Sequence, residues 1–261
     1  MPNLVAIQSD GPVVTITLNR PEQHNSFTPD LLAALLDALT AARHHHGVRV
    51  AVLQATGPSF SRGTDIAGLA GHADRALYAD QVLRQLHQVM LAVIDLPVPL
   101  VVAVQGPATG SAMGLVLAAD VVLVAPEASF TAYTTTLGLS PEGGWATLLP
   151  RLIGQRRAAE ALLLERPISA AEAVAWGLAN RLVPASHLAE ETQALAHQMA
   201  AQLPGSIACT RRLLWSERDR LAAELDRERE LFCAQIQSIE ADIGLNAFLD
   251  RQRAMMTEAD L

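Results

Sequence analysis

The chain has 261 residues, half of them hydrophobic and 18% charged, which excludes a disordered protein and is typical of one large domain. The net charge of −8 argues against a nucleic-acid partner, and because all 19 basic residues are arginine, chemistry that needs a Schiff-base or phosphate-loop lysine is excluded. Two cysteines, no apolar run of membrane length and no recognisable signal peptide predict a cytoplasmic protein without a membrane partner.

In chain order, the first two-thirds of the sequence alternates predicted strands with predicted helices. Strands are predicted from β-branched and apolar runs at residues 4–8, 13–19, 48–54, 100–104 and 121–124. Helices are predicted at residues 29–42, 78–94 and 111–119, with Thr28 as the N-cap of the first. The turn signal Asp10-Gly11-Pro12 joins the first two strands as a hairpin. The later apolar runs indicate strands that are buried on both faces.

After about residue 143 the strand signals nearly stop. Helices are predicted at residues 145–153, 156–163, 170–176, 188–203, 207–217 and 221–253, the last of them broken near Gly244. One further short strand is predicted at residues 181–183. Alternating strands and helices followed by helices alone indicate an α/β fold with a parallel-sheet core and a helical extension. We place the core at residues 1–200 and the extension at residues 201–261.

Two glycine-containing loops follow buried strands, at residues 60–65 and 106–111. In a parallel sheet the carboxyl ends of the strands form the usual ligand crevice. Backbone N–H groups at such turns and helix starts are free to bind an anion or a developing oxyanion. Taken singly, each loop is also explained as a glycine turn between two elements.

Taken together, the loops and several other segments resemble the crotonase superfamily, which contains the enoyl-CoA hydratases and isomerases. The matching segments are residues 19–26, 60–66, 105–120, 126–130, 138–144, 149–154, 170–173 and 176–178. The resemblance covers residues 4–185 well and implies a crotonase (ClpP/crotonase-like) spiral of ββα turns with a helical C-terminal trimerisation region. It implies a homotrimer or a homohexamer, as does the apolar surface of the predicted tail helices. The apolar residues concerned are Leu213, Leu214, Leu221, Leu225, Phe232 and Ile236.

The resemblance also implies the ligand, an acyl-CoA thioester, with coenzyme A as part of the substrate and no separate cofactor or metal. Its carbonyl oxygen would accept hydrogen bonds from the backbone N–H groups of Thr64 and Ser111, where the family usually has Ala and Gly. A backbone donor tolerates a change of side chain, and Ser111 at a helix start adds the positive end of the helix dipole. The other residues that the resemblance places along the substrate are Gln23, His24, Ser26, Arg62, Gly63, Asp65, Ile66, Gly110, Thr134 and Leu137.

The acidic residues predict the reaction. Hydratases of the family use two glutamates, and their positions are occupied here by Gly114 and Thr134, neither of which can deprotonate water. Glu142 remains, at the position of the single catalytic acid in the family's enoyl-CoA isomerases. One carboxylate can remove an α-proton and return it at the γ-carbon. We therefore predict an enoyl-CoA isomerase with Glu142 as its acid–base group.

Other interpretations stay open. Glu142 is also explained as a first-turn helix acid, and Asp65 is better explained as an N-cap than as a catalytic residue. The protein is alternatively a catalytically degenerate acyl-CoA binder, or an isomerase of ring-acyl-CoA substrates. Residues 109–114 also resemble the nucleophile segment of Clp-type serine hydrolases, which would need a histidine base near Ser111. The adjacent histidines at residues 44–46 are explained as a solvated helix end rather than a metal site.

Overall fold

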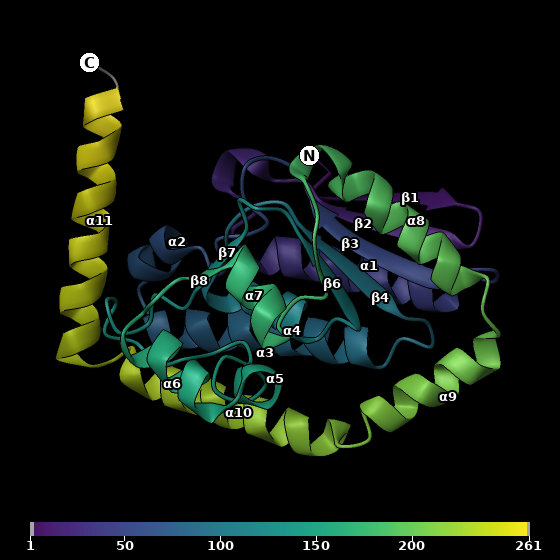
Figure 1. Ribbon diagram of the computed structural model, residues 1–261. Helices are drawn as coiled ribbons and strands as arrows, with labels where there is room; N and C mark the ends of the chain where they lie inside the picture. The colour runs from purple at the N-terminus through teal and green to yellow at the C-terminus, as the bar shows by residue number, and fades with distance from the viewer. Residues whose placement is uncertain (1–2, 260–261) are drawn as a thin grey trace.

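A six-stranded sheet forms the centre of the computed structural model, which describes residues 3–259. Its strands follow the order β1-β2-β3-β4-β6-β9 (Figure 1). Their bounds are Val5–Asp10 for β1, Val13–Leu18 for β2, Val50–Ala55 for β3, Leu100–Val104 for β4, Val121–Val124 for β6 and Arg181–Leu182 for β9. The β1–β2 hairpin is antiparallel and every other pair is parallel. The six strands predicted from the sequence are therefore present.

Helices cover both faces of this sheet, which is why its central strands are continuous apolar runs. On one face, Val101 and Ala103 of β4 pack in a cluster with apolar residues of α8 (Leu188–Ala200). On the other face, Val102 and Val104 belong to the main core, which includes α1 (Pro29–His44) and α3 (Arg75–Ile94). The Thr28 side chain accepts a hydrogen bond from the Leu31 N–H, so it caps α1 as predicted.

A second, three-stranded sheet was not predicted. It consists of β5 (Ala108–Thr109), β7 (Ser129–Thr131) and β8 (Ile168–Ser169). These strands have two or three residues each, too few for an alternating pattern to be visible in the sequence. β5 leads directly into the 3-10 helix η2 (Gly110–Ala112) and α4 (Met113–Leu117), so this small sheet positions the second glycine loop.

The remaining short elements connect these layers. They are η1 (Pro21–Gln23), α2 (Ile66–Gly71), α5 (Leu149–Ile153), α6 (Gln155–Leu163), α7 (Ala170–Trp176) and η3 (Ala185–His187). The helix predicted at residues 145–153 begins only at Leu149, after a turn in which Gly143 and Gly144 adopt positive φ angles. Within residues 3–259, no helix is long and apolar enough to cross a membrane.

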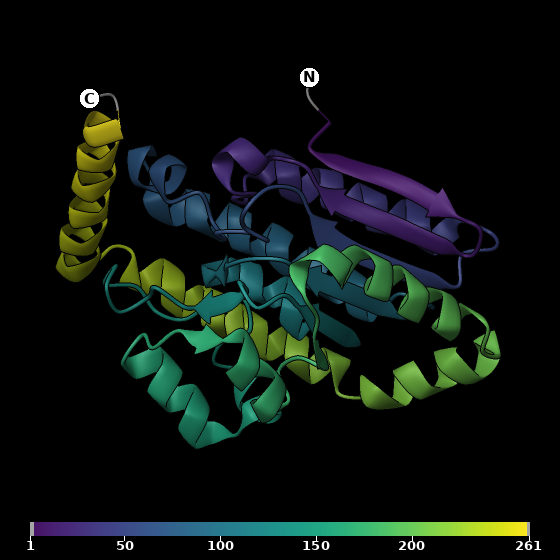
Figure 2. The same cartoon turned by 45° about the horizontal axis from the view of Figure 1, so that its top comes forward.

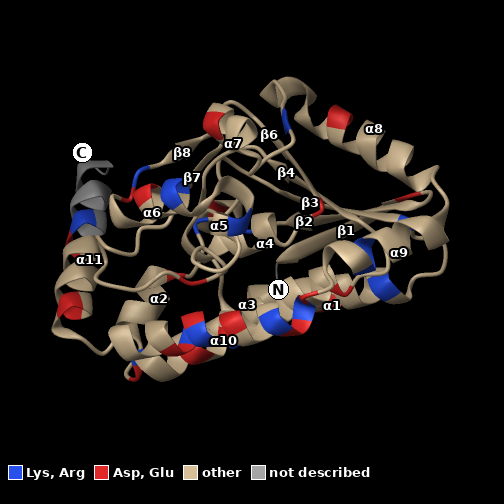
Figure 3. Ribbon diagram, turned by 60° about the horizontal axis from the view of Figure 1, so that its bottom comes forward, with Lys and Arg blue, Asp and Glu red and all other residues tan. Residues whose placement is uncertain are grey.

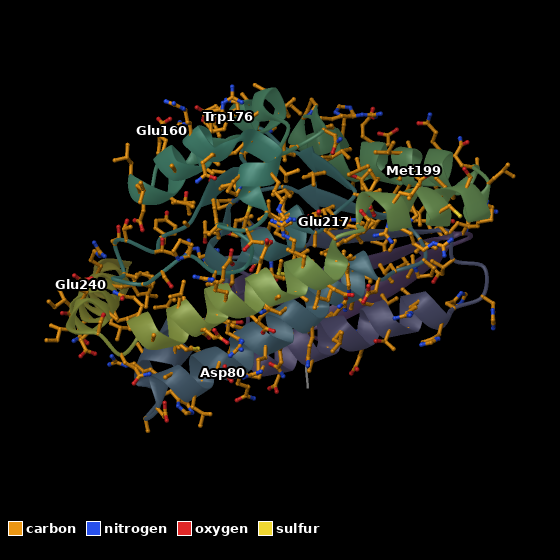
Figure 4. The ribbon with its side chains drawn as sticks, turned by 90° about the horizontal axis from the view of Figure 1, so that it is seen from below. Asp80, Glu160, Trp176, Met199, Glu217 and Glu240 are labelled. Atoms are coloured by element: carbon orange, nitrogen blue, oxygen red, sulfur yellow. The ribbon has the colours of Figure 1, made fainter. Side chains whose placement is uncertain are left out.

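The C-terminal helices are α9 (Pro204–Leu214), α10 (Arg218–Gln235) and α11 (Ile239–Ala259). α10 runs along α3 and carries closely spaced charges of both signs (Figures 1 and 3). Figure 4 shows Asp80 of α3 below α10, where Asp80 pairs with Arg229. α10 and the residue that follows it pack against the core of the same chain, so part of the apolar surface that we assigned to assembly is already buried. Of the six apolar residues assigned to it, Leu221, Leu225, Phe232 and Ile236 are buried within this chain, and Leu213 and Leu214 are exposed.

Gly244 does not break the last helix, contrary to the prediction. α11 runs through it, and the chain turns between α10 and α11 instead. In Figure 2, α11 stands at the side of the molecule, next to the end of α10. A Cβ atom at Gly244 would lie 2.3 Å from the carbonyl carbon of Leu137, so glycine here permits contact between two backbones.

Candidate active site

The two glycine loops meet, as predicted from their places after parallel strands. The first loop is bound on one side to the early segment, where the Phe27 N–H donates to the Gly63 carbonyl at 2.7 Å. On its other side, the Thr109 N–H donates to the Ser61 carbonyl at 3.0 Å. Backbone hydrogen bonds therefore hold three segments that are distant in sequence in one cluster.

Thr64 and Ser111 are in direct contact across these loops. The Thr64 N–H donates to Ser111 Oγ at 2.6 Å, and Thr64 Oγ1 lies 2.9 Å from the same oxygen. Ser111 is fully buried in η2, within the first turn of a helical stretch where N–H groups lack partners inside the helix. Gly63, with φ of 74°, allows this approach, because a Cβ there would lie 2.8 Å from both the nitrogen and the Oγ of Ser111.

Glu142 lies next to this pair and is only 5% exposed. Burial, reinforced by the charge of Glu228, raises the pKa of Glu142 to about 8, although a hydrogen bond with the Ser111 side chain lowers it. Among the described residues, its Oε2 atom has no hydrogen-bond partner. Glu142 belongs to the irregular segment before α5, so its interpretation as a first-turn helix acid is wrong. The carboxyl is therefore mainly neutral at pH 7.

Glu228 of α10 holds the turn that follows Glu142, and sequence reasoning missed it. Its carboxylate accepts from the Gly144 N–H at 2.8 Å, the Ala146 N–H at 3.1 Å and the Thr147 hydroxyl at 2.6 Å. It is buried, which raises its pKa. No local signal distinguishes it from the other acidic residues of a highly charged helix.

At one of the two positions that the resemblance assigns to hydratase glutamates, the structure leaves little room for a side chain. A Cβ atom at Gly114 would lie 2.7 Å from Met90 Sδ and 3.2 Å from the Gly143 carbonyl, so Met90 fills the space that an acid would need. Thr134, at the second of these positions, is buried, and its hydroxyl has no hydrogen-bond partner among the side chains and backbone groups that the structure describes. Leu137 follows on the same segment, buried against α11.

The residues predicted to line the coenzyme A portion lie in two adjoining segments. Gln23 and Ser26 form one turn, in which Ser26 Oγ donates to the Gln23 carbonyl at 2.8 Å. His24 has a positive φ of 50°, and its Nδ1 lies 3.0 Å from Ser59 Oγ. Burial, and then the charge of Arg62, lower the pKa of His24. The Arg62 N–H donates to the His24 carbonyl at 3.0 Å, so the two segments are joined.

Asp65 is the N-cap residue of α2, as we predicted from the sequence. Its Oδ1 accepts from the Gly68 N–H at 3.1 Å, and Ile66 is the first residue of the helix. Gly110 has a positive φ of 51°, and its carbonyl accepts from the Trp145 indole N–H at 2.7 Å. That bond joins the second loop to the turn after Glu142.

The family follows from a comparison with known sequences. Residues 8–259 match the family model described as enoyl-CoA hydratase/isomerase. This chain belongs to the enoyl-CoA hydratase/isomerase family. The match extends through the C-terminal helices, beyond residues 4–185 that the resemblance covers well.

Relatives of this family member carry names for different reactions. It is 38% identical over 235 residues to "Probable enoyl-CoA hydratase EchA12" of Mycobacterium tuberculosis, covering 87% of this chain and 82% of the relative. It is 31% identical over 248 residues to the 1,2-epoxyphenylacetyl-CoA isomerase of Escherichia coli, covering 94% and 95%. A solved enoyl-CoA hydratase/isomerase from Pseudoalteromonas atlantica superposes with a TM-score of 0.85 at 30% identity, covering 95% of this chain and 97% of that one. The crotonase fold is therefore shown, whereas the names of these relatives do not agree on one reaction.

Proposed function

We propose that this family member is an enoyl-CoA isomerase that moves the double bond of a straight-chain 3-enoyl-CoA with Glu142 as its single acid–base group. The burial of Glu142 beside the contact between Thr64 and Ser111 carries the proposal. A hydratase would need acid–base groups to hold and deprotonate water, and the positions for them hold Gly114 and Thr134.

The chemistry requires one proton and no redox step. The Glu142 carboxylate removes a proton from C2 of the 3-enoyl thioester, and the C–H electrons delocalise onto the carbonyl oxygen as a dienolate. The backbone N–H groups of Thr64 and Ser111 stabilise the negative oxygen. Glu142, now protonated, returns the proton at C4, so the double bond ends between C2 and C3. Coenzyme A is part of the substrate, and the step needs no separate cofactor.

The raised pKa suits this exchange. With a pKa of about 8, about one-tenth of the Glu142 side chains are ionised at pH 7, and each ionised one is a stronger base than an exposed carboxylate. The rate of proton abstraction should therefore rise with pH up to about pH 8–9.

A second candidate is isomerisation of a ring-acyl-CoA, favoured by the similarity to 1,2-epoxyphenylacetyl-CoA isomerase. A Clp-type hydrolase is disfavoured, because within the described part of the chain the side chain of Ser111 contacts Thr64 and Glu142 and not a histidine. A degenerate acyl-CoA binder would keep ligand affinity without turnover.

Glu142→Gln tests the proposal on a panel of 3-enoyl, 2-enoyl and aryl CoA thioesters. General acid–base catalysis is worth about 10²–10⁴-fold, so isomerase activity should fall by at least that factor, while thioester affinity stays unchanged. Normal turnover in the variant would contradict the single-base mechanism. Thioester binding without wild-type turnover on any substrate would favour the degenerate binder.

The proposal includes assembly as a homotrimer or homohexamer. Leu213 and Leu214 are about three-quarters exposed, at 76% and 72%, and assembly would bury them. Light scattering at micromolar concentration should give a trimeric or hexameric mass, and a monomeric mass would contradict this part.

A further inference from the structure

The Ser111 hydroxyl occupies a position that the proposed reaction needs for the substrate. The Thr64 N–H, one of the two proposed donors to the thioester oxygen, already donates to Ser111 Oγ at 2.6 Å. One N–H makes one well-aligned hydrogen bond, so a substrate oxygen and Ser111 Oγ compete for it. Ser111 is fully buried, so this contact belongs to the interior of the site.

A second contact holds the hydroxyl in this position. Thr64 Oγ1 lies 2.9 Å from Ser111 Oγ, so both the backbone and the side chain of Thr64 bind the same oxygen. Gly63 leaves space for that oxygen, because a Cβ atom there would lie 2.8 Å from it. The side chains of Thr64 and Ser111 therefore meet at the proposed oxyanion site.

We propose that the Ser111 hydroxyl fills the oxyanion site of the free enzyme and that a substrate thioester oxygen must displace it, so that Ser111 sets the affinity for acyl thioesters. The inference rests on the proposed acyl-CoA function and adds a positioning residue to it. A serine side chain has three staggered χ1 positions, so rotation about χ1 is the movement that the displacement requires.

The cost of displacement falls on binding. It is the same for the bound thioester and for the dienolate, because in both cases the Thr64 N–H has left Ser111 Oγ. A cost that is equal in the ground state and the transition state changes KM and leaves kcat unaltered. It applies only to ligands that present an oxygen to the Thr64 N–H.

Two ligands that differ at that oxygen separate this role from a general effect on the site. Butyryl-CoA is a thioester without the double bond that the reaction moves, and S-butyl-CoA is its thioether analogue without a carbonyl oxygen. Calorimetry on the full chain should show that Ser111→Ala and Ser111→Gly bind butyryl-CoA about three- to tenfold more tightly, the equilibrium value of one ordinary hydrogen bond. Affinity for S-butyl-CoA should not change.

Two further variants serve as matched comparisons. Thr64→Val keeps the backbone N–H and removes one contact to Ser111 Oγ, so it should shift thioester affinity in the same direction by a smaller factor. Ser61 is a buried serine of the same loop whose Oγ bonds to Asn25 O at 2.8 Å and Gly63 N at 3.1 Å. Ser61→Ala should leave the ratio of thioester to thioether affinity as in the wild type.

The kinetics give an independent check, since Ser111→Ala should lower KM severalfold on the high-pH plateau of the rate, where Glu142 is ionised with or without its hydrogen bond to the Ser111 side chain. Unchanged or weaker binding of butyryl-CoA by both Ser111 variants would overturn this inference and leave the Glu142 mechanism standing. Failure of the wild type to bind either CoA compound would refute the proposed function and this inference together.

Discussion

Replacing Glu142 by Gln should stabilise the folded chain, and the gain should depend on pH. Burial and Glu228 raise the pKa of this carboxyl from 4.5 to about 8 on folding. Because the folded pKa is the higher one, the stability that the neutral carboxyl contributes is fully present below about pH 4.5. It is lost as the pH rises through about 8. A glutamine side chain does not ionise, so its contribution to folding stability does not change between these pH values.

The magnitude follows from the same two values. Each difference of 1 in pKa corresponds to about 1.4 kcal/mol, so the full cost of the buried Glu142 carboxylate is on the order of 5 kcal/mol above pH 8. At pH 6 the cost is about 2 kcal/mol, because there only the unfolded chain is ionised. The unfolding free energy of Glu142→Gln, relative to wild type, should therefore grow by about 2–3 kcal/mol between pH 6 and pH 9.

Urea unfolding followed by circular dichroism at pH 6, 7, 8 and 9, at one protein concentration, measures this difference. Glu127→Gln, at an exposed carboxyl, is the matched control for loss of a charge elsewhere. A Glu142→Gln difference that stays constant from pH 6 to pH 9 would refute the reasoning. It would mean that the carboxyl is already ionised in the folded chain at pH 6.

Two substitutions test the packing around the site. Gly114→Glu restores one hydratase acid but drives its Cβ to 2.7 Å from Met90 Sδ, so we expect a lower urea midpoint and no hydratase activity. A stable variant that hydrates 2-enoyl-CoA would show that Met90 moves aside. Gly244→Ala brings a Cβ to 2.3 Å from the Leu137 carbonyl carbon, so we expect thermal destabilisation of about 2 kcal/mol or more. Gly205→Ala has no atom within 4 Å of its new Cβ and serves as the control; equal effects of the two would contradict the close-contact argument.

The regular elements could be predicted where burial imposes a pattern within one segment. β4 and α7 begin and end where the sequence predicts them, since one is an apolar run covered on both faces and the other a short helix with a capping Ser169. α2 was missed because it has six residues and contains glycine, which is a poor helix former. The turn before α5 was predicted as helix because the contact that prevents it comes from α10, far along the chain.

The residues of the candidate site also divide into those that the sequence predicts and those that only the folded structure shows. Thr64, Ser111 and Glu142 could be located because their motifs lie in continuous segments, and the structure brings these segments together. The position of the Ser111 hydroxyl could not be predicted, because it depends on which rotamer the serine side chain adopts next to Thr64. Glu228 could not be found either, because only folding distinguishes it from neighbouring acids on an exposed, charged helix.

The bonds from Glu228 also have a consequence for the order in which the protein acquires activity during synthesis. The backbone donor at Gly144 and its acceptor are separated by 84 positions along the chain. A nascent chain can complete its central sheet and both glycine loops before α10 leaves the ribosome, yet the segment carrying Glu142 then lacks the carboxylate that binds its turn. The turn that follows Glu142 would thus gain its final hydrogen bonds only when α10 packs, so the proposed catalytic competence would be acquired late.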